Sequence, residues 1–508
     1  IIALLVLLNA CNKLDLAPED YFGSGSFWKN KAQVEGAMVG LHGQLRGNHF
    51  NFYALGEMRG GTLKEGTGAT GTSSLNSGAL IRQDLRESAP GISGWAGFYS
   101  PIFQINNFIY QVEQATFLAD QEKGYLLGQA YGLRAYYYFH LFRTFGRVPL
   151  ATEPKVFTNP PTSSDQAYLP RTKTEKETLD FIKSDIDKSV SNFSGDYTTK
   201  FQKSLWSLAA TQMLKSEVYL WSAKVKMDGQ APANTTADLA TARTAVEAVI
   251  PKYALQTAFA NVFSYTNKGN NEIILALRYS VGEATNFYNQ FIYAPTDPMT
   301  SFFDKAGNAL PSDPLKIAGG GTIIRYEYKY DLFAKYDEAD TRAQVTFFDF
   351  YKKPMTPANS FVNMRKFMGV IDNNARIFAD DFPVYRLAEA LLILAEIKNK
   401  QGQDPSAEIN LVRKRAYATA PAYVNGSFEQ NELAIFEERG KELVAEGKRW
   451  YDLRRMQDAS GDPLAFRKDL PLVGVLDKNS EAHKLLWPID RGTLTADETL
   501  VNDQNPGY

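Results

Sequence analysis

The sequence predicts a mainly α-helical fold, in which tetratricopeptide-like pairs of helices form a scaffold beside an irregular, loop-rich lobe with a few short strands. Apolar residues recur at helical spacing in several long segments. Small residues such as Ala209 and Ala210 stand among them, and small side chains let stacked helices approach closely. The chain shows no strict period of about 34 residues, so we expect irregular pairs.

The helical scaffold is expected mainly over residues 28–46, 95–260 and 380–456. Leu133–Phe142 is apolar nearly all round, which predicts a helix that is buried on both sides. Further helices are predicted over residues 27–45, 204–223, 237–250 and 384–401.

The loop-rich lobe is expected mainly over residues 47–94 and 261–379, within a single domain that extends over residues 28–508. The stretch from Gly47 to Gly97 is rich in Gly, Thr, Ser and Asn, and loops of that length are usually functional. In the second range, Ile274 with Ala276 and the alternation over residues 325–330 indicate short strands.

Composition excludes several classes of protein. The chain has 508 residues, of which 44% are apolar, so it can bury a sizeable core and is neither collagen-like nor largely disordered. Its net charge of -2 supplies no basic footprint, so we expect no nucleic-acid partner. No apolar run reaches the roughly 18 to 20 residues that span a bilayer.

The amino-terminal residues resemble an export signal that ends in a lipidation site. Residues 1–10 are apolar except for Asn9 and are interpreted as the remnant of a signal peptide. Cys11 is the single cysteine of the chain and follows directly, as in a bacterial lipobox. Residues 11–27 would then form the lipidated end and its tether, since several acyl chains give stable anchoring. The alternative for Cys11 is a lone buried thiol.

No constellation of residues predicts catalysis, a metal site or a cofactor. The four histidines His42, His49, His140 and His483 lack the spacing of a zinc site. Glu438, Glu442 and Glu446 lie one helical turn apart, as a paired-carboxylate glycosidase would need, but Arg439, Arg449 and Arg455 are available to neutralise them. Carboxylates held by arginine are poor general acids. We therefore expect a structural helix here, with the charge of Glu442 matched by Arg439 and partly buried.

Aromatic residues in the predicted loops are the best candidates for a binding site. A flat ring can stack on the apolar face of a sugar, while arginines, carboxylates and amides bind its hydroxyl groups. The alternative is that these rings fill the underside of their own loops. The candidate ligand-binding residues are Phe52, Tyr53, Arg82, Asp84, Trp95, Phe98, Phe287, Tyr288 and Tyr293.

Several stretches, in order along the whole chain, resemble the SusD/RagB family of surface lipoproteins of Bacteroidetes. After the lipobox at Cys11, the matching stretches are Trp95 with Tyr99, Ile102 and Asn106; Leu133–Phe139 continued by Phe145–Leu150; Arg386–Glu389; Asn410 with Arg413, Arg415 and Ala416; Glu438–Arg455; Trp487–Ile489; and Gln504–Tyr508.

The resemblance implies a non-catalytic nutrient-binding protein. Members of this family sit on a SusC-like TonB-dependent transporter of the outer membrane, are displayed at the cell surface through a lipid anchor, and bind an oligosaccharide or, in some members, a peptide. The family often places an aromatic residue near the ligand where this chain has Trp95. The expected partners are therefore a glycan, or alternatively a peptide, and such a transporter.

Overall fold

The computed structural model describes residues 27–66, 76–91, 95–163, 168–293, 297–317, 324–417, 419 and 421–508. The predicted signal remnant, Cys11 and all of the tether before Phe27 lie outside these residues. The longer helices are α1 (Lys31–Gly47), α4 (Ala96–Gln114), α5 (Asp120–Phe145), α8 (Glu175–Phe193), α9 (Leu208–Lys224), α10 (Thr235–Val249), α14 (Leu387–Lys400), α15 (Ser406–Ala416) and α16 (Phe428–Glu442).

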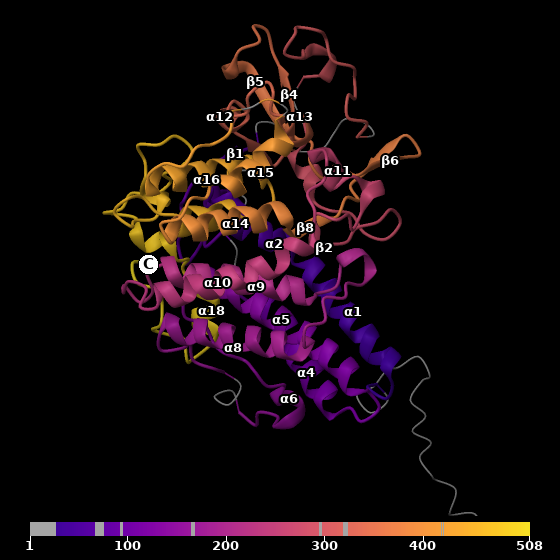
Figure 1. Cartoon of the computed structure of the whole chain (residues 1–508), viewed down its shortest axis with the longest axis vertical. Coiled ribbons are helices and arrows are strands. Elements are labelled where there is room, and N and C mark those ends of the chain that lie inside the picture. The colour runs from indigo at the N-terminus through magenta and orange to yellow at the C-terminus, as the bar shows by residue number, and fades with distance from the viewer. Residues whose placement is uncertain are drawn as a thin grey trace, which may run out of the picture.

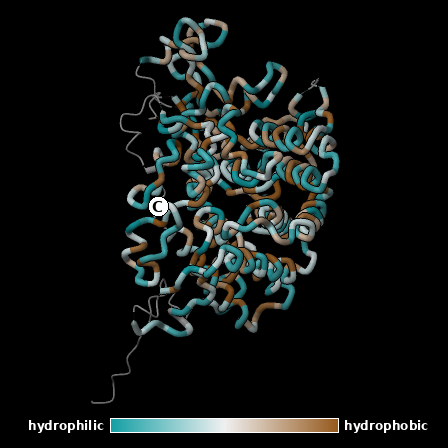
Figure 2. The backbone as a smooth tube through the Cα atoms, turned by 90° about the vertical axis from the view of Figure 1, so that its left-hand side faces the viewer, coloured by the Kyte–Doolittle hydropathy of each residue, from teal (hydrophilic) through white to brown (hydrophobic). Residues whose placement is uncertain are grey.

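These helices stack in chain order. α1 packs on α4, α4 on α5, α5 on α8, α8 on α9, and α9 on α10, which in turn contacts α14. α14 then packs on α15 and α16 (Figure 1). Hydrophobic and hydrophilic stretches alternate along the stacked helices (Figure 2), as expected for amphipathic elements. The predicted fold class of tetratricopeptide-like helix pairs is confirmed.

Helix α5 lies in the middle of the stack and is buried on all sides from Tyr125 to Phe145, as predicted for Leu133–Phe142. Close approach of its neighbours depends on a glycine. A Cβ atom at Gly132 would lie 2.1 Å from Nε1 of Trp206, so no larger residue fits there. Side-chain caps set other helix starts: Thr174, Ser207 and Ser427 accept hydrogen bonds from the first turns of α8, α9 and α16.

The strands form two-stranded antiparallel ladders in the loop-rich lobe. Those predicted around Ile274 and over residues 325–330 are present, although the second ends at Tyr328 because helix α12 (Tyr330–Phe333) begins two residues later. The pairs are β1 (Leu63–Glu65) with β3 (Tyr326–Tyr328), β2 (Ile273–Leu277) with β8 (Phe382–Arg386), β4 (Phe347–Tyr351) with β5 (Ser360–Met364), and β6 (Val370–Asp372) with β7 (Ala375–Ile377).

The prediction of a continuous loop after Gly47 is wrong. The chain forms helix α2 (His49–Tyr53), a π-helix (Ala54–Met58), β1 and helix α3 (Asn76–Ile81) in this region. Phe52 and Tyr53 therefore belong to a helix, and α4 begins directly after Trp95. The composition of this stretch is typical of loops. Its aromatic side chains nevertheless pack against the scaffold, and the segment that holds them is helical.

The remaining short helices are α6 (Lys155–Thr158), α11 (Phe259–Phe263), α13 (Arg342–Thr346), α17 (Arg449–Arg455) and α18 (Arg491–Ala496). The prediction of one helix from Glu438 to Arg455 is wrong, because α16 ends at Glu442 and α17 starts seven residues later. Ala445 and Gly447 between them have positive φ angles of 66° and 70°. This turn packs on the π-helix so closely that a Cβ atom at Gly56 would lie 1.7 Å from the carbonyl oxygen of Gly447.

A buried network of charges joins the scaffold to the loop-rich lobe. None of its side chains is more than 4% exposed. Its carboxylates belong to Glu272, Asp340, Glu438, Glu442 and Glu446, and its cations to Arg342, Lys366, Arg386 and Arg415.

Glu442 lies at the centre of this network. Its oxygens accept hydrogen bonds from Arg386 at 2.6 Å and Arg342 at 3.0 Å, and it also pairs with Arg415. Burial alone would raise the pKa of Glu442, but the charges of these three arginines hold it well below its usual range. Glu442 is thus matched by arginine as predicted, but Arg439 as its partner is wrong: that arginine bonds Asp452 at 2.8 Å.

We expect Glu442→Ala to lower the free energy of unfolding by about 3 to 5 kcal/mol, because it leaves buried arginines uncompensated. Glu437→Ala is the matched control on the same helix, since Glu437 is 57% exposed and pairs with Lys335 at 3.0 Å. Its loss should stay under about 1 kcal/mol. Thermal and denaturant unfolding measure both. Equal stability of the two variants would contradict a central role for Glu442.

Candidate functional site

The β1–β3 ladder brings an ion pair and two half-buried aromatic rings together. Glu65 lies opposite Tyr326 in this ladder and forms an ion pair with Arg82, which follows α3. The ring of Phe50 lies 6.3 Å from that of Tyr326 and 5.2 Å from that of Phe287. Phe50, Glu65, Arg82 and Phe287 together form what we term the β1–β3 surface.

The turn that presents Arg82 is anchored from below. Gln83 adopts a left-handed backbone with φ of 57° and is buried. Its side chain accepts a hydrogen bond from Nε of Arg59 at 2.8 Å and donates one to the carbonyl of Arg59 at 2.9 Å. The Arg59 guanidinium in turn lies 3.9 Å from the ring centroid of Trp450. The residues on either side of Gln83, Arg82 and Asp84, therefore reach solvent.

Asp84 forms part of the same exposed turn. Both of its carboxylate oxygens accept hydrogen bonds from Arg86, at 2.9 and 2.6 Å. These bonds lower the pKa of Asp84, so it is ionised at neutral pH. The turn thus offers both hydrogen-bond donors and acceptors of the kind that bind hydroxyl groups.

Beneath the β1–β3 surface lies a cluster of aromatic rings that contains several predicted site residues. The rings of Phe287 and Tyr288 stack at 4.5 Å, and Tyr53 lies 5.3 Å from Phe287. Phe52 lies 5.7 Å from Phe98 at the junction with the helical stack. The structure thus brings five of the predicted aromatic residues into one region, but mostly as its core.

A buried carboxyl group lies at the base of this cluster. The hydroxyl of Tyr328 lies 3.4 Å from Oε1 of Glu57 and 3.1 Å from the hydroxyl of Tyr53. Oε1 also accepts from the backbone N–H of Ala445 at 3.3 Å, whereas the buried Oε2 has no hydrogen-bond partner among the described residues. Burial raises the pKa of Glu57 from 4.5 to about 7. The carboxyl is therefore protonated over much of the acidic range.

The other predicted site residues lie apart from this cluster. Trp95 is only 8% exposed, and its ring packs at 5.4 Å against Phe145 and at 5.9 Å against Tyr99. Tyr293 is buried and donates a hydrogen bond to Asp313. Because the ring is packed on both sides, truncation of Trp95 to alanine should lower the melting temperature. Its part in ligand binding stays a prediction, as does that of the other candidate residues.

Exposure divides the predicted residues into two groups. Phe52, Tyr53, Phe98, Tyr288 and Tyr293 are buried, whereas Phe287 and Asp84 are half-buried and Arg82 is exposed. Sequence reasoning missed Glu65 and Tyr326 as members of the site. The signal for Tyr326 is the alternation over residues 325–330, which places it on a strand, but its pairing with β1 is a long-range contact that one sequence does not reveal.

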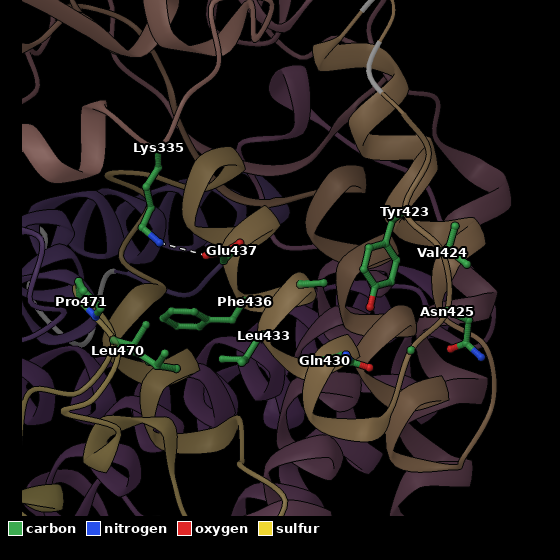
Figure 3. A pocket seen from close by; sticks show the side chains of 13 residues that line it. Lys335, Tyr423, Val424, Asn425, Gln430, Leu433, Phe436, Glu437, Leu470 and Pro471 are labelled. Carbon is green, nitrogen blue, oxygen red and sulfur yellow. Dashed lines mark hydrogen bonds and ion pairs between the residues drawn. The ribbon is translucent and has the colours of Figure 1, made fainter.

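A groove elsewhere on the described part of the molecule contains none of the predicted residues. A groove of about 710 Å³ lies along α16 and is lined by Tyr423, Val424, Leu433, Phe436 and Leu470 among others (Figure 3). Its charged residues Lys335 and Glu437 pair with each other across 3.0 Å. Over the described ranges, no three His, Cys, Asp or Glu side chains are grouped so as to hold a metal ion.

No helix within the described part of the chain combines the length and apolar character needed to cross a membrane. The molecule is a helical-repeat scaffold that carries a small aromatic and charged surface on its loop-rich lobe.

Comparison with known proteins identifies the family. A model of the SusD family matches residues 272–508, and a model described as starch-binding and associating with the outer membrane matches residues 60–220. A SusD superfamily protein of Bacteroides fragilis is 37% identical, with a TM-score of 0.86 over 95% of this chain and 100% of that one. The chain belongs to the SusD family.

Three further proteins resemble this chain. NanU of B. fragilis is 33% identical, with a TM-score of 0.81 over 97% of this chain and 99% of that one. A SusD-like protein of Formosa agariphila is 27% identical over 96% of this chain and 93% of its own length. Surface glycan-binding protein A of Bacteroides thetaiotaomicron, solved in complex with laminarihexaose, shares the fold with a TM-score of 0.68 at 17% identity, covering 94% of this chain and 100% of that one.

Glu57 predicts a pH dependence of stability. Its pKa is raised on folding, so the native state keeps a proton that the unfolded state releases, and stability falls as pH rises from about 4.5 to about 7. Glu57→Gln removes this loss. We expect the variant to gain up to about 3 kcal/mol over the wild type at pH 8 and little at pH 4. Melting temperatures across this range measure the difference.

Glu338→Gln, which changes an exposed carboxylate, provides the control and should show no such trend. A constant difference between Glu57→Gln and wild type at all pH values would mean that Glu57 keeps an ordinary pKa in the folded protein.

Proposed function

We propose that this protein binds an oligosaccharide or polysaccharide at the cell surface and passes it to a SusC-like TonB-dependent transporter in the outer membrane. The observation that carries the proposal is the β1–β3 surface, where Phe50 packs on Phe287 and on Tyr326, the ladder partner of Glu65, and Glu65 pairs with Arg82. Family membership over the whole described scaffold supports the same function. So does the laminarihexaose complex of the structural relative, as a property of that protein.

The chemistry of this surface suits a sugar. A pyranose ring offers an apolar face of C–H groups, which favours contact with Phe50 and Phe287. Its hydroxyl groups need charged or amide partners, and Arg82 supplies up to five N–H donors in a planar fork. Asp84 extends the polar part, since it lies on the same exposed turn as Arg82 and pairs with Arg86.

Binding without chemical conversion is the expected activity. A glycosidase needs two carboxyl groups that face each other across an accessible bond. On this surface Glu65 is paired with Arg82. In the buried charge network, arginines lower the pKa of Glu442, which suits a structural role better than proton donation.

We further propose that residues 28–508 act as one unit, held at the membrane by lipid on Cys11 with residues 11–27 as the tether. The apolar residues 1–10 before the single cysteine support this proposal.

The first test of this function is glycan recognition. Screening the Cys11→Ser full-length protein on an array of oligosaccharides, laminarihexaose included, identifies a ligand, and calorimetry then measures its affinity. We expect Arg82→Ala to weaken binding roughly 10- to 100-fold, the usual value of hydrogen bonds to a charged group. Arg243→Ala is the matched control, because Arg243 pairs with Glu247 at 2.8 Å on the outer face of α10.

Unchanged affinity in Arg82→Ala would remove the β1–β3 surface from the binding site. Binding of peptides with no glycan bound would instead favour the peptide-binding alternative.

The second test concerns the anchor. Acylation needs the sulfur of Cys11, so Cys11→Ser should release the protein from the membrane fraction while leaving its melting temperature unchanged. Fractionation in a strain that lacks the partner transporter is the measurement, since a protein contact could otherwise hold the variant. Retention of Cys11→Ser in that strain would rule out a lipid anchor.

A further inference from the structure

A cavity of about 620 Å³ lies on the scaffold near the carboxyl terminus, apart from the β1–β3 surface. It is formed where the ends of α5 and α9 meet the segment that follows α17. Its volume falls within the range of about 300 to 1,000 Å³ that is typical of small-molecule sites. None of the residues predicted to bind ligand lines it.

The walls of this cavity are mainly apolar. Phe142 and Trp221 are buried in the stack behind it, whereas Val225, Phe466 and Leu485 are half-buried and line the cavity itself. These side chains come from α5, α9 and the carboxyl-terminal segment. A hydrocarbon ring or chain would therefore find an apolar surface on several sides.

Arg454 on α17 also lines the cavity, and its guanidinium forms no close ion pair with a described carboxylate. It is only 6% exposed. Nη1 donates a hydrogen bond to the carbonyl of Arg143, and Nε has no partner. Among the residues that the structure describes, no carboxylate lies within 4.0 Å of this guanidinium. Burial lowers its pKa to about 10, so it remains charged at neutral pH.

The neighbouring arginine shows how unusual this is. Arg455, the next residue of α17, forms ion pairs at 2.8 Å with both Glu396 and Asp452. Burying a charge without a partner lowers the free energy of unfolding, because the charge loses its hydration. An anion from outside the chain would therefore stabilise the charge of Arg454.

The other cations around the cavity already have acidic partners. Lys224 is paired with Glu396 and Glu432, Arg147 with Asp503, and Lys478 with Asp462 at 2.5 Å. Lys226 lies 4.0 Å from the same Asp462.

The nearest acidic group inside the cavity is Glu175, at the start of α8. Burial and the negative charge of Asp228 raise its pKa, whereas the charge of Arg454 lowers it.

We propose that this cavity binds a small amphipathic anion, with a carboxylate or phosphate group on Arg454 and an apolar ring or chain against Val225, Phe466 and Leu485. The site is independent of the proposed glycan function. Benzoate and phenyl phosphate are suitable probes, and benzyl alcohol is the neutral analogue of the same size. NMR titration of the full-length Cys11→Ser protein should show at least one of the anions binding about tenfold or more tightly than benzyl alcohol.

Arg454→Gln should weaken binding of the anion about tenfold or more and leave binding of benzyl alcohol unchanged. Lys226→Gln removes a lining cation that already has a partner, and should change neither affinity by more than about twofold. Val225→Trp keeps Arg454 but fills the cavity, and should abolish binding of all three probes even if Arg454→Gln fails to fold.

Several results would overturn the proposal. These are the absence of saturable anion binding up to about 10 mM, equal affinity for the anions and benzyl alcohol, or anion binding that survives Val225→Trp. Comparison of benzoate with phenyl phosphate distinguishes a carboxylate ligand from a phosphate ligand.

Discussion

The pairing of Arg386 with Glu442 and Glu446 is the interaction on which the arrangement of the two parts depends. Arg386 ends β8, whose partner strand β2 belongs to the loop-rich lobe, while both glutamates lie on or just after α16 in the scaffold. Arg342 and Lys366 add further links from the lobe to the same region. Each of these charges is removed from water, so each position requires its partner in place. The lobe can therefore pack on the scaffold in one register only.

This constraint extends to the candidate site through the turn after α16. Glu446 lies in that turn, and the carbonyl of Ala445 beside it accepts a hydrogen bond from the hydroxyl of Tyr288 at 2.7 Å. Tyr288 stacks on Phe287, which is part of the β1–β3 surface. The same turn approaches the π-helix at Gly56, next to Glu57. The half-exposed rings are thus held from below by residues that are themselves fixed by the charge network.

Periodic features of the fold could be predicted from the sequence, whereas long-range pairing could not. The burial of α5 follows from the apolar side chains of Leu133–Phe142, which leave no polar face. α8 was missed although Leu179, Ile182 and Ile186 recur at helical spacing, because Lys, Asp and Ser dominate its composition. The partners of Glu442 come from α13, β8 and α15, and nothing local distinguishes them from Arg439.

Loop-like composition was also misleading for the aromatic residues. Phe52 and Tyr53 follow a glycine-rich boundary, yet they are covered by rings of α4, α5 and the lobe. Their burial depends on neighbours more than 40 residues away in the chain. Phe287, Arg82 and Asp84 were selected from residue type alone. In the structure Arg82 pairs with Glu65 and Phe287 packs on Phe50, and their part in ligand binding stays a prediction.

The arginines of the charge network differ from Arg454 in the partners that surround them. Where arginines of this fold hold two parts together, as Arg342, Arg386 and Arg415 do, each faces at least two carboxylates at close range. Arg454 is equally removed from water but faces a backbone carbonyl and the ring of Trp221, 5.0 Å away. Cation–π contact and one neutral acceptor compensate a buried charge less than a carboxylate does. Arg454 therefore differs from the three arginines of the network, because its charge faces neutral groups and not carboxylates at close range.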